Sequence, residues 1–133
     1  MPSEGVEIVR RGYEAYEVWG VEGILEFLDP EIEWRNPTDS PIAGVFQGHE
    51  GVREWQRQAD EAWDEIKFTP EEIVDAPDGR VLAICTGRIR GRSSGAVVEV
   101  PFAHVIEVRG GKLTAFRMYP DVSEARAAVG FSA

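Results

Sequence analysis

The chain has 133 residues, 43% of them hydrophobic and 29% charged, which is the size and composition of a single globular domain over residues 1–133. Its formal net charge of −10 excludes a nucleic-acid partner, because phosphate binding needs a basic surface and no run of Lys and Arg supplies one. The single cysteine excludes an intrachain disulfide, no apolar run reaches the ~20 residues of a membrane span, and the first ten residues do not resemble a secretion signal, so we expect a cytoplasmic protein with no membrane partner.

The first half of the chain has the periodicity of helices. Apolar residues recur at three- and four-residue spacings from Val6 to Trp19, which predicts a helix that begins after Ser3 and ends at Gly20. Turn residues at Asn36-Pro37 end a short alternating segment. The expected elements are helices over 4–19, 21–28 and from about 48 to 63, a strand over 31–35 and a loop over 37–47.

From Ile66 onward the period changes to that of strands, and Pro70 predicts either an edge strand or an interruption. Helices followed by strands are typical of an α+β fold rather than of alternating βαβ units. The expected elements are strands over 67–76, 81–90, 97–108 and 113–119 and a closing helix over 124–129.

The long strand over 97–108 places a histidine among apolar side chains. Alternation puts His104 on one face, which we take as the inner face, with Val98, Val100, Phe102, Ile106 and Val108. Two interpretations are open. His104 is either a core histidine satisfied by one hydrogen bond or a group that faces a ligand.

Aromatic residues are frequent, with four Trp, three Tyr and six Phe. They are either plain core or the walls of an apolar pocket that holds a few polar groups, the usual form of a small-molecule site. Cys85 has no basic neighbour in sequence and is expected to be a small apolar filler rather than a nucleophile. The candidate pocket residues are Tyr13, Tyr16, Trp34, Asn36, Phe46, Trp55, Gln56, Cys85 and Phe102, with His104.

The order of these elements resembles the nuclear transport factor 2-like superfamily, in its SnoaL-like and ketosteroid isomerase-related branch. The resemblance covers nearly the whole chain and is strongest at Trp34-Arg35-Asn36-Pro37, in the segment 48–55, at 110–113 and at 117–121. It implies a cone-shaped, curved antiparallel sheet wrapped around N-terminal helices, with a conical pocket, in a cystatin-like α+β barrel. It also implies a homodimer, since many members of the family are dimeric.

The family's catalytic residues are only partly present. By resemblance, Tyr13 matches the helix-1 tyrosine of the isomerase oxyanion hole, and His104 takes the place of its second oxyanion acid. Asn36 stands where the isomerase has its proton-shuttling aspartate. Against limonene-type epoxide hydrolases, Trp34 and Asn36 match the water-holding pair. The Arg-Asp pair of those enzymes falls on Cys85 and Gly87, and their second catalytic aspartate falls on Met118. The acid and base residues of the epoxide hydrolases are therefore missing, as is the isomerase base at Asn36.

The register of the last hairpin decides which side chains face the pocket. A two-residue turn at Gly110-Gly111 turns Arg117 and Tyr119 inward, whereas a glycine bulge at the turn turns Phe116 and Met118 inward. The resemblance favours the bulge and adds Phe116 and Met118 to the pocket. The outer face then carries Ala103, Val105, Ala115 and Tyr119, and this apolar face predicts the dimer surface.

Two functions follow from these residues. The first is a protein that binds a small hydrophobic or ring-containing molecule, with isomerase, cyclase or lyase chemistry from His104, Tyr13 and Asn36. The second is a non-catalytic dimeric module with a filled pocket. Asp39 could replace the missing base. His49 and His104 lack the spacing of metal ligands, so we expect neither metal nor cofactor.

Overall fold

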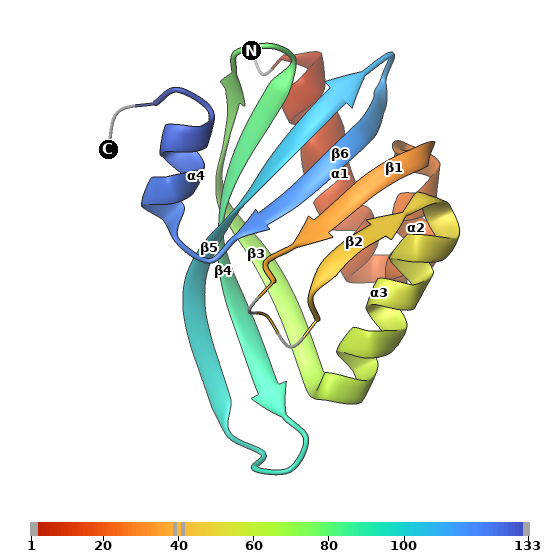
Figure 1. Ribbon diagram of the computed structural model, residues 1–133, viewed down its shortest axis with the longest axis vertical. Coiled ribbons are helices and arrows are strands. Elements are labelled where there is room, and N and C mark those ends of the chain that lie inside the picture. The colour runs from red at the N-terminus through yellow and green to blue at the C-terminus, as the bar shows by residue number, and fades with distance from the viewer. Residues whose placement is uncertain (1–2, 39, 41, 132–133) are drawn as a thin grey trace.

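The computed structural model describes residues 3–38, 40 and 42–131. Helices predominate in the first half of the chain and strands in the second, which confirms the α+β assignment (Figure 1). In chain order the elements are α1 (Glu4–Trp19), α2 (Val21–Ile24), the short 3₁₀ helix η1 (Leu25–Phe27), β1 (Leu28–Asn36), β2 (Gly44–Gln47), α3 (Gly48–Ala62), β3 (Trp63–Ala76), β4 (Arg80–Gly91), β5 (Val97–Arg109), β6 (Lys112–Tyr119) and α4 (Val122–Ala128).

The sheet is mixed and does not close on itself. Its strand order is β2-β1-β6-β5-β4-β3, and β1 runs parallel to β6 while all other pairs are antiparallel. The predicted fold class is confirmed, but the prediction of an antiparallel sheet was wrong for the pairing of β1 with β6. The expected loop over 37–47 contains a sixth strand, β2, whose four residues are too few for their alternation to be recognised.

The helices begin where the sequence indicates. The side chain of Ser3 accepts a hydrogen bond from the Val6 amide and caps α1, and Gly20 ends that helix with a φ of 69°. The expected second helix is shorter, because the chain is already extended at Leu28 and passes through Asp29-Pro30 as part of β1. Trp19 was counted on the apolar face of α1, but it is the last residue of the helix and is exposed.

The β5–β6 hairpin combines two features that the sequence analysis treated as alternatives. Arg109 pairs with Lys112, so Gly110 and Gly111 form a two-residue turn, and both have positive φ. A bulge at Thr114 then shifts the register between Glu107 and Val108. One extra residue in a strand moves the side chains of all later residues to the opposite face of the sheet. Phe116 and Met118 therefore point inward, as predicted, although the bulge lies inside the strand and not at the turn.

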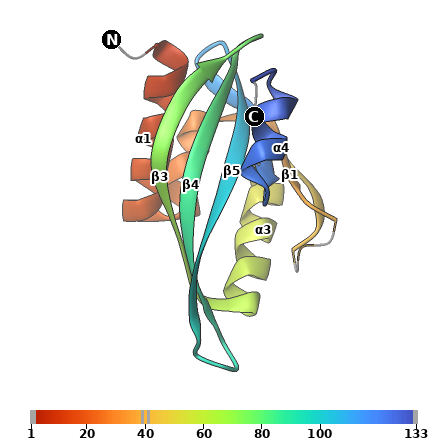
Figure 2. The same cartoon turned by 90° about the vertical axis from the view of Figure 1, so that its left-hand side faces the viewer.

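The β4–β5 hairpin extends past the body of the molecule (Figures 1 and 2). Val98 and Val100 were expected on the buried inner face, but they are 54% and 38% exposed. The alternation is intact, and only the region from Phe102 to Ile106 has helices packed against it. Strand periodicity gives the direction of a side chain, and burial depends on what covers it.

The outer face of the sheet is partly covered by α4, on the side opposite α1 (Figure 1). Ala125 and Val129 pack against Leu82 and Ala103, and all four are fully buried. Asp121 caps α4 by accepting from the amides of Ser123 and Glu124. Part of the apolar outer face that predicted a dimer is thus buried within the chain. None of the described helices is long and apolar enough to cross a membrane.

We propose that the remainder of this face forms a homodimer. Val105, Ala115 and Tyr119 are only partly buried after α4 has docked. Sedimentation velocity at micromolar concentration should give twice the chain mass of 14.8 kDa. Ala115→Asp should give monomers that still fold, because the side chain is partly exposed within one chain. A wild-type protein that sediments as a monomer contradicts the proposal.

Candidate functional site

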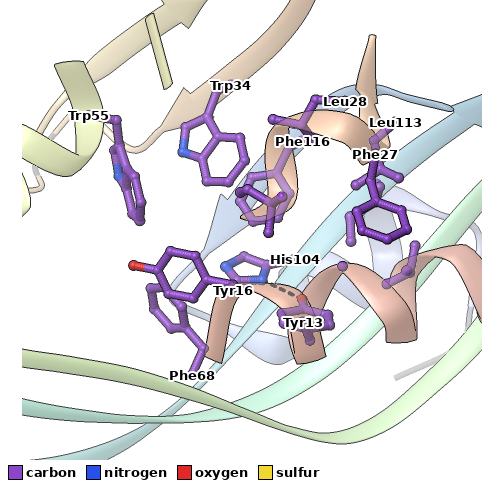
Figure 3. Close-up of a pocket in the computed structure, with 14 residues that line it drawn as sticks. Tyr13, Tyr16, Phe27, Leu28, Trp34, Trp55, Phe68, His104, Leu113 and Phe116 are labelled. Carbon is purple, nitrogen blue, oxygen red and sulfur yellow. Dashed lines mark hydrogen bonds between the residues drawn. The ribbon is translucent and has the colours of Figure 1, made fainter. Parts of the chain in front are cut away.

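Two adjoining cavities lie between α1, α3 and the inner face of the sheet (Figure 3). The inner cavity measures about 40 Å³ and the outer one about 80 Å³. The side chains that border both form a common wall, which consists of Trp34, Trp55, Phe68, His104 and Phe116. The inner cavity is completed by Val9, Gly12, Tyr13, Tyr16, Ile24, Phe27, Leu28, Ile106 and Leu113. The outer cavity is completed by Asn36, Ser40, Ile42, Trp63, Ile66, Gly87, Ile89, Val100, Phe102 and Met118.

His104 lies at the centre of the common wall. It is 2% exposed, and its ring lies 4.2 Å from that of Phe116 and 5.5 Å from that of Phe68. Its Nδ1 atom is 2.6 Å from the Tyr13 hydroxyl, the contact drawn as a dashed line in Figure 3. The amphipathic face of α1 brings Tyr13 inward, and the alternation of β5 does the same for His104. The two predicted residues, 91 positions apart, therefore meet.

Burial keeps this cluster uncharged. It lowers the pKa of His104 from 6.5 to about 3 and raises the pKa of Tyr13 well above its usual value. Burial also raises the pKa of the Cys85 thiol to about 11. The three side chains are linked, because the thiol of Cys85 donates to the Tyr13 oxygen over 3.6 Å. Near neutral pH the cluster is a thiol, a phenol and a neutral imidazole.

The direction of the Tyr13–His104 bond follows from these protonation states. A neutral phenol is a strong donor, and an unprotonated imidazole nitrogen is a much better acceptor than a thiol sulfur. The Tyr13 hydroxyl therefore donates to Nδ1, and the remaining imidazole proton must be on Nε2. Nε2 lies on the other edge of the ring and has no hydrogen-bond partner among the described residues. His104 borders both cavities, so its N–H donor belongs to the wall that they share.

Two further donors in the outer cavity have no partner. The indole Nε1 of Trp34 and the amide Nδ2 of Asn36 are buried and make no hydrogen bond within the described part of the chain. Trp34 is 4% exposed, and its ring stacks on Phe116 at 3.9 Å. A buried donor without a partner lowers stability.

Gly12 leaves the inner cavity open. It is buried in the middle of α1, where glycine costs about 1 kcal/mol relative to alanine. A Cβ atom built at Gly12 meets no atom within 4 Å, although the residue borders the inner cavity. An alanine therefore fits sterically and would occupy part of the empty space.

Most of the predicted pocket residues line the cavities, but three do not. Phe46 is in β2, where it pairs with Trp34 and packs in the core. Gln56 lies behind Tyr16, and its Oε1 atom accepts a hydrogen bond from the Tyr16 hydroxyl at 2.7 Å. Cys85 is buried behind Tyr13. Phe46 was predicted in a loop, Gln56 on a helix and Cys85 on a strand, and the sequence pattern could not show which side chains separate them from the cavities.

Phe68 is the main residue that sequence reasoning missed. It borders both cavities and packs edge-on against His104. The alternation of Ile66 and Phe68 before Pro70 was the available signal, because β3 is regular from Glu65 to Pro70, between its two irregularities. Asp39, the candidate replacement base, lies outside the described residues. Within the described residues no group of three His, Cys, Asp or Glu side chains could hold a metal ion.

Comparisons with known proteins agree with this architecture. The sequence model of the SnoaL-like domain matches residues 9–116. An uncharacterised protein of Mycobacterium tuberculosis is 27% identical over 110 residues, which is 82% of each chain. A nuclear transport factor 2-like protein of Burkholderia xenovorans is 30% identical, with a TM-score of 0.75 over 98% of both chains. TerC, co-crystallised with polyporic acid, is 23% identical, with a TM-score of 0.80 over 96% of this chain and 98% of its own.

The lowered pKa of His104 predicts how stability depends on pH. Below pH 6.5 the unfolded chain binds a proton on this side chain, whereas the folded protein does not until about pH 3. The stability contribution is therefore intact above pH 6.5 and declines below it, by about 2 kcal/mol between pH 7 and pH 5. Urea unfolding should show this loss in the wild type and a correspondingly smaller one in His104→Phe. Equal losses in the two proteins would mean that the pKa of His104 is not lowered in the folded protein.

Proposed function

The chain belongs to the SnoaL-like domain family, and we propose that it binds one small, uncharged, mainly apolar molecule in the cavities around His104. The observation that carries this proposal is the Tyr13–His104 hydrogen bond of 2.6 Å. It fixes a neutral imidazole among aromatic rings and directs an N–H donor at otherwise apolar walls. A pocket of apolar side chains with a few oriented polar groups is the usual form of a small-molecule site.

The same bond supports polarisation of a ligand oxygen better than proton abstraction. With Nδ1 occupied by Tyr13 and a proton on Nε2, His104 has no free lone pair to accept a proton. A histidine with a pKa of about 3 is also a weak base. No carboxylate borders either cavity among the described residues. Isomerase, cyclase or lyase chemistry would then rest on hydrogen-bond stabilisation of a developing negative charge by His104, with Asn36 orienting the substrate.

One relative supports a ligand role for this fold. TerC was crystallised together with polyporic acid, so a protein with the same architecture has been examined with a small organic molecule. We carry over from it only the class of partner, a small molecule. Identity of 23% establishes the shared fold, and the residues around the ligand differ freely at that level.

A non-catalytic module with a filled pocket is the second candidate, and the packing of the aromatic rings favours it. Trp34 lies 5.1 Å from Trp55, and Trp55 lies 6.3 Å from Phe68, so these rings already contact one another. Gly12 favours the first candidate, because a filled and unused pocket has no need of a destabilising glycine beside an empty space.

Gly12→Ala separates the two candidates. The new methyl group should raise the free energy of unfolding by about 1 kcal/mol, because alanine is the better helix former and no atom obstructs it. It should also weaken binding of an apolar probe such as α-methylstyrene, measured by NMR titration. Val18→Ala is the control, since Val18 is exposed on the same helix. Its probe affinity should match the wild type. Failure of the wild type to bind any such probe supports the filled module instead.

Steroid isomerisation should be absent. Asn36 stands where ketosteroid isomerase has its base, and an amide cannot accept the proton that a carboxylate accepts. The two cavities, of about 40 and 80 Å³, are also small for a four-ring substrate. We expect no turnover of a Δ5-ketosteroid above background in the ultraviolet assay for the conjugated product. Turnover at enzyme-like rates would contradict this and would direct attention to Asp39 or His104.

A further inference from the structure

We propose that Trp34 and Asn36 form a second polar subsite in the outer cavity, which accepts the carbonyl oxygen of a single-ring ligand. The inference rests on the proposed function, because it names the class of molecule that the same pocket takes. The subsite adds the N–H groups of Trp34 and Asn36 to that of His104, and the small volume of the cavities limits the size of the ligand.

The first step is that both donors lack partners in the empty protein. Nε1 of Trp34 and Nδ2 of Asn36 are buried and make no hydrogen bond within the described part of the chain, and both residues border the outer cavity. Trp34 is only 4% exposed, so bulk water does not accept a hydrogen bond from its indole N–H. A ligand oxygen would restore the hydrogen bonds that folding removed.

The second step is the register of the sheet, which brings these donors to the same place as His104. Trp34 and Asn36 are two residues apart on β1 and share its inner face. Arg35 pairs with Arg117, so Asn36 lies beside Met118, and Met118 pairs with His104. Asn36 and His104 therefore stand on either side of Met118, about 10 Å apart at their Cα atoms by two interstrand spacings. The register therefore brings the two residues to the same part of the outer cavity, which both of them border together with Met118.

The third step is the chemistry that this arrangement selects. The described side chains of the outer cavity include no carboxylate, and the Ser40 hydroxyl already accepts from the Ile42 amide. Donors thus outnumber acceptors, which favours a ligand that accepts. A cation is disfavoured because a positive charge in this cavity would meet hydrogen-bond donors and, among the described side chains, no carboxylate.

The fourth step is size. An engineered apolar cavity of roughly 150 Å³ takes one benzene molecule. The two cavities here, of about 40 and 80 Å³, together approach that volume only if their common wall shifts. One ring with a carbonyl group is therefore the largest ligand that moderate movement of Trp34 and Phe116 accommodates.

The test compares acetophenone with α-methylstyrene, which has the same planar shape but carries CH₂ in place of the oxygen. NMR titration gives both affinities for the wild type, Trp34→Phe and Asn36→Leu. Each variant should bind acetophenone about three- to ten-fold more weakly, the worth of one neutral hydrogen bond, and should bind α-methylstyrene no worse. Comparing each ligand across variants cancels the difference in its own hydration. Trp19→Phe, at an exposed tryptophan, is the matched control and should change neither affinity.

Stability gives a second readout in the empty protein. Asn36→Leu removes an unpartnered buried donor with little change in volume, so it should leave the urea midpoint unchanged or raise it. Trp34→Phe also removes part of a buried ring that stacks on Phe116, so its midpoint should fall whatever the indole N–H bonds to. A lowered midpoint for Asn36→Leu with unaltered selectivity would show that its amide already has a partner in the empty protein, and would overturn the proposal. If a variant does not fold, the wild type still decides. Acetophenone should shift the Trp34 indole proton downfield, and α-methylstyrene should not.

The results distinguish a failure of the Trp34–Asn36 subsite from a failure of the proposed function. Equal responses of both ligands to the variants contradict the subsite alone, because the pocket then binds by apolar contact. Failure of both ligands to bind the wild type contradicts the proposed function and the subsite with it.

Discussion

A hydrogen bond of 2.6 Å between the Tyr13 hydroxyl and Nδ1 of His104 connects the first helix to the middle of the sheet. His104 is buried and Tyr13 is partly buried among aromatic side chains, so loss of either hydrogen-bonding group would lower the stability of the protein. The bond also determines where the imidazole proton lies and hence what the cavity offers to a ligand. Cys85 supports it from behind by donating to the same phenolic oxygen. Packing, protonation and recognition thus depend on one contact between residues distant in sequence.

The stability of the molecule is not optimised around this contact. Trp34 and Asn36 carry buried donors without partners, and Gly12 occupies a helix interior where an alanine fits. Each of these features lowers stability, and all three border the same pair of cavities. By contrast, the smaller apolar cluster under α4 is closely packed and contains no such defect among its described residues, Leu82, Ala103, Ala125 and Val129. A third buried donor without a partner among the described residues, Nε of Arg90, does not border the cavities. The other unfavourable features named here are concentrated at one place, which is typical of a functional site.

The sequence predicted the elements that have long, regular patterns. The boundaries of α1 followed from Ser3 and Gly20, and the inward direction of His104 followed from alternation along β5. It did not predict what depends on distant neighbours. The parallel pairing of β1 with β6, the four-residue β2 and the bulge at Thr114 leave no periodic signal. Within the site, Tyr13 and His104 were identified together through the family resemblance, whereas the place of Phe68 in the wall depends on how β3 curves over α1.

The protonation of His104 at neutral pH is the central claim, because a donor at Nε2 and an acceptor at Nδ1 account for the proposed recognition. Nitrogen-15 NMR of histidine-labelled protein at pH 7 measures it directly, with His104→Phe used to assign the signals. The account predicts a neutral ring that is protonated at Nε2, with the Nδ1 resonance of a nitrogen that accepts a hydrogen bond. A ring protonated at Nδ1, or an imidazolium with both nitrogens protonated, would contradict it.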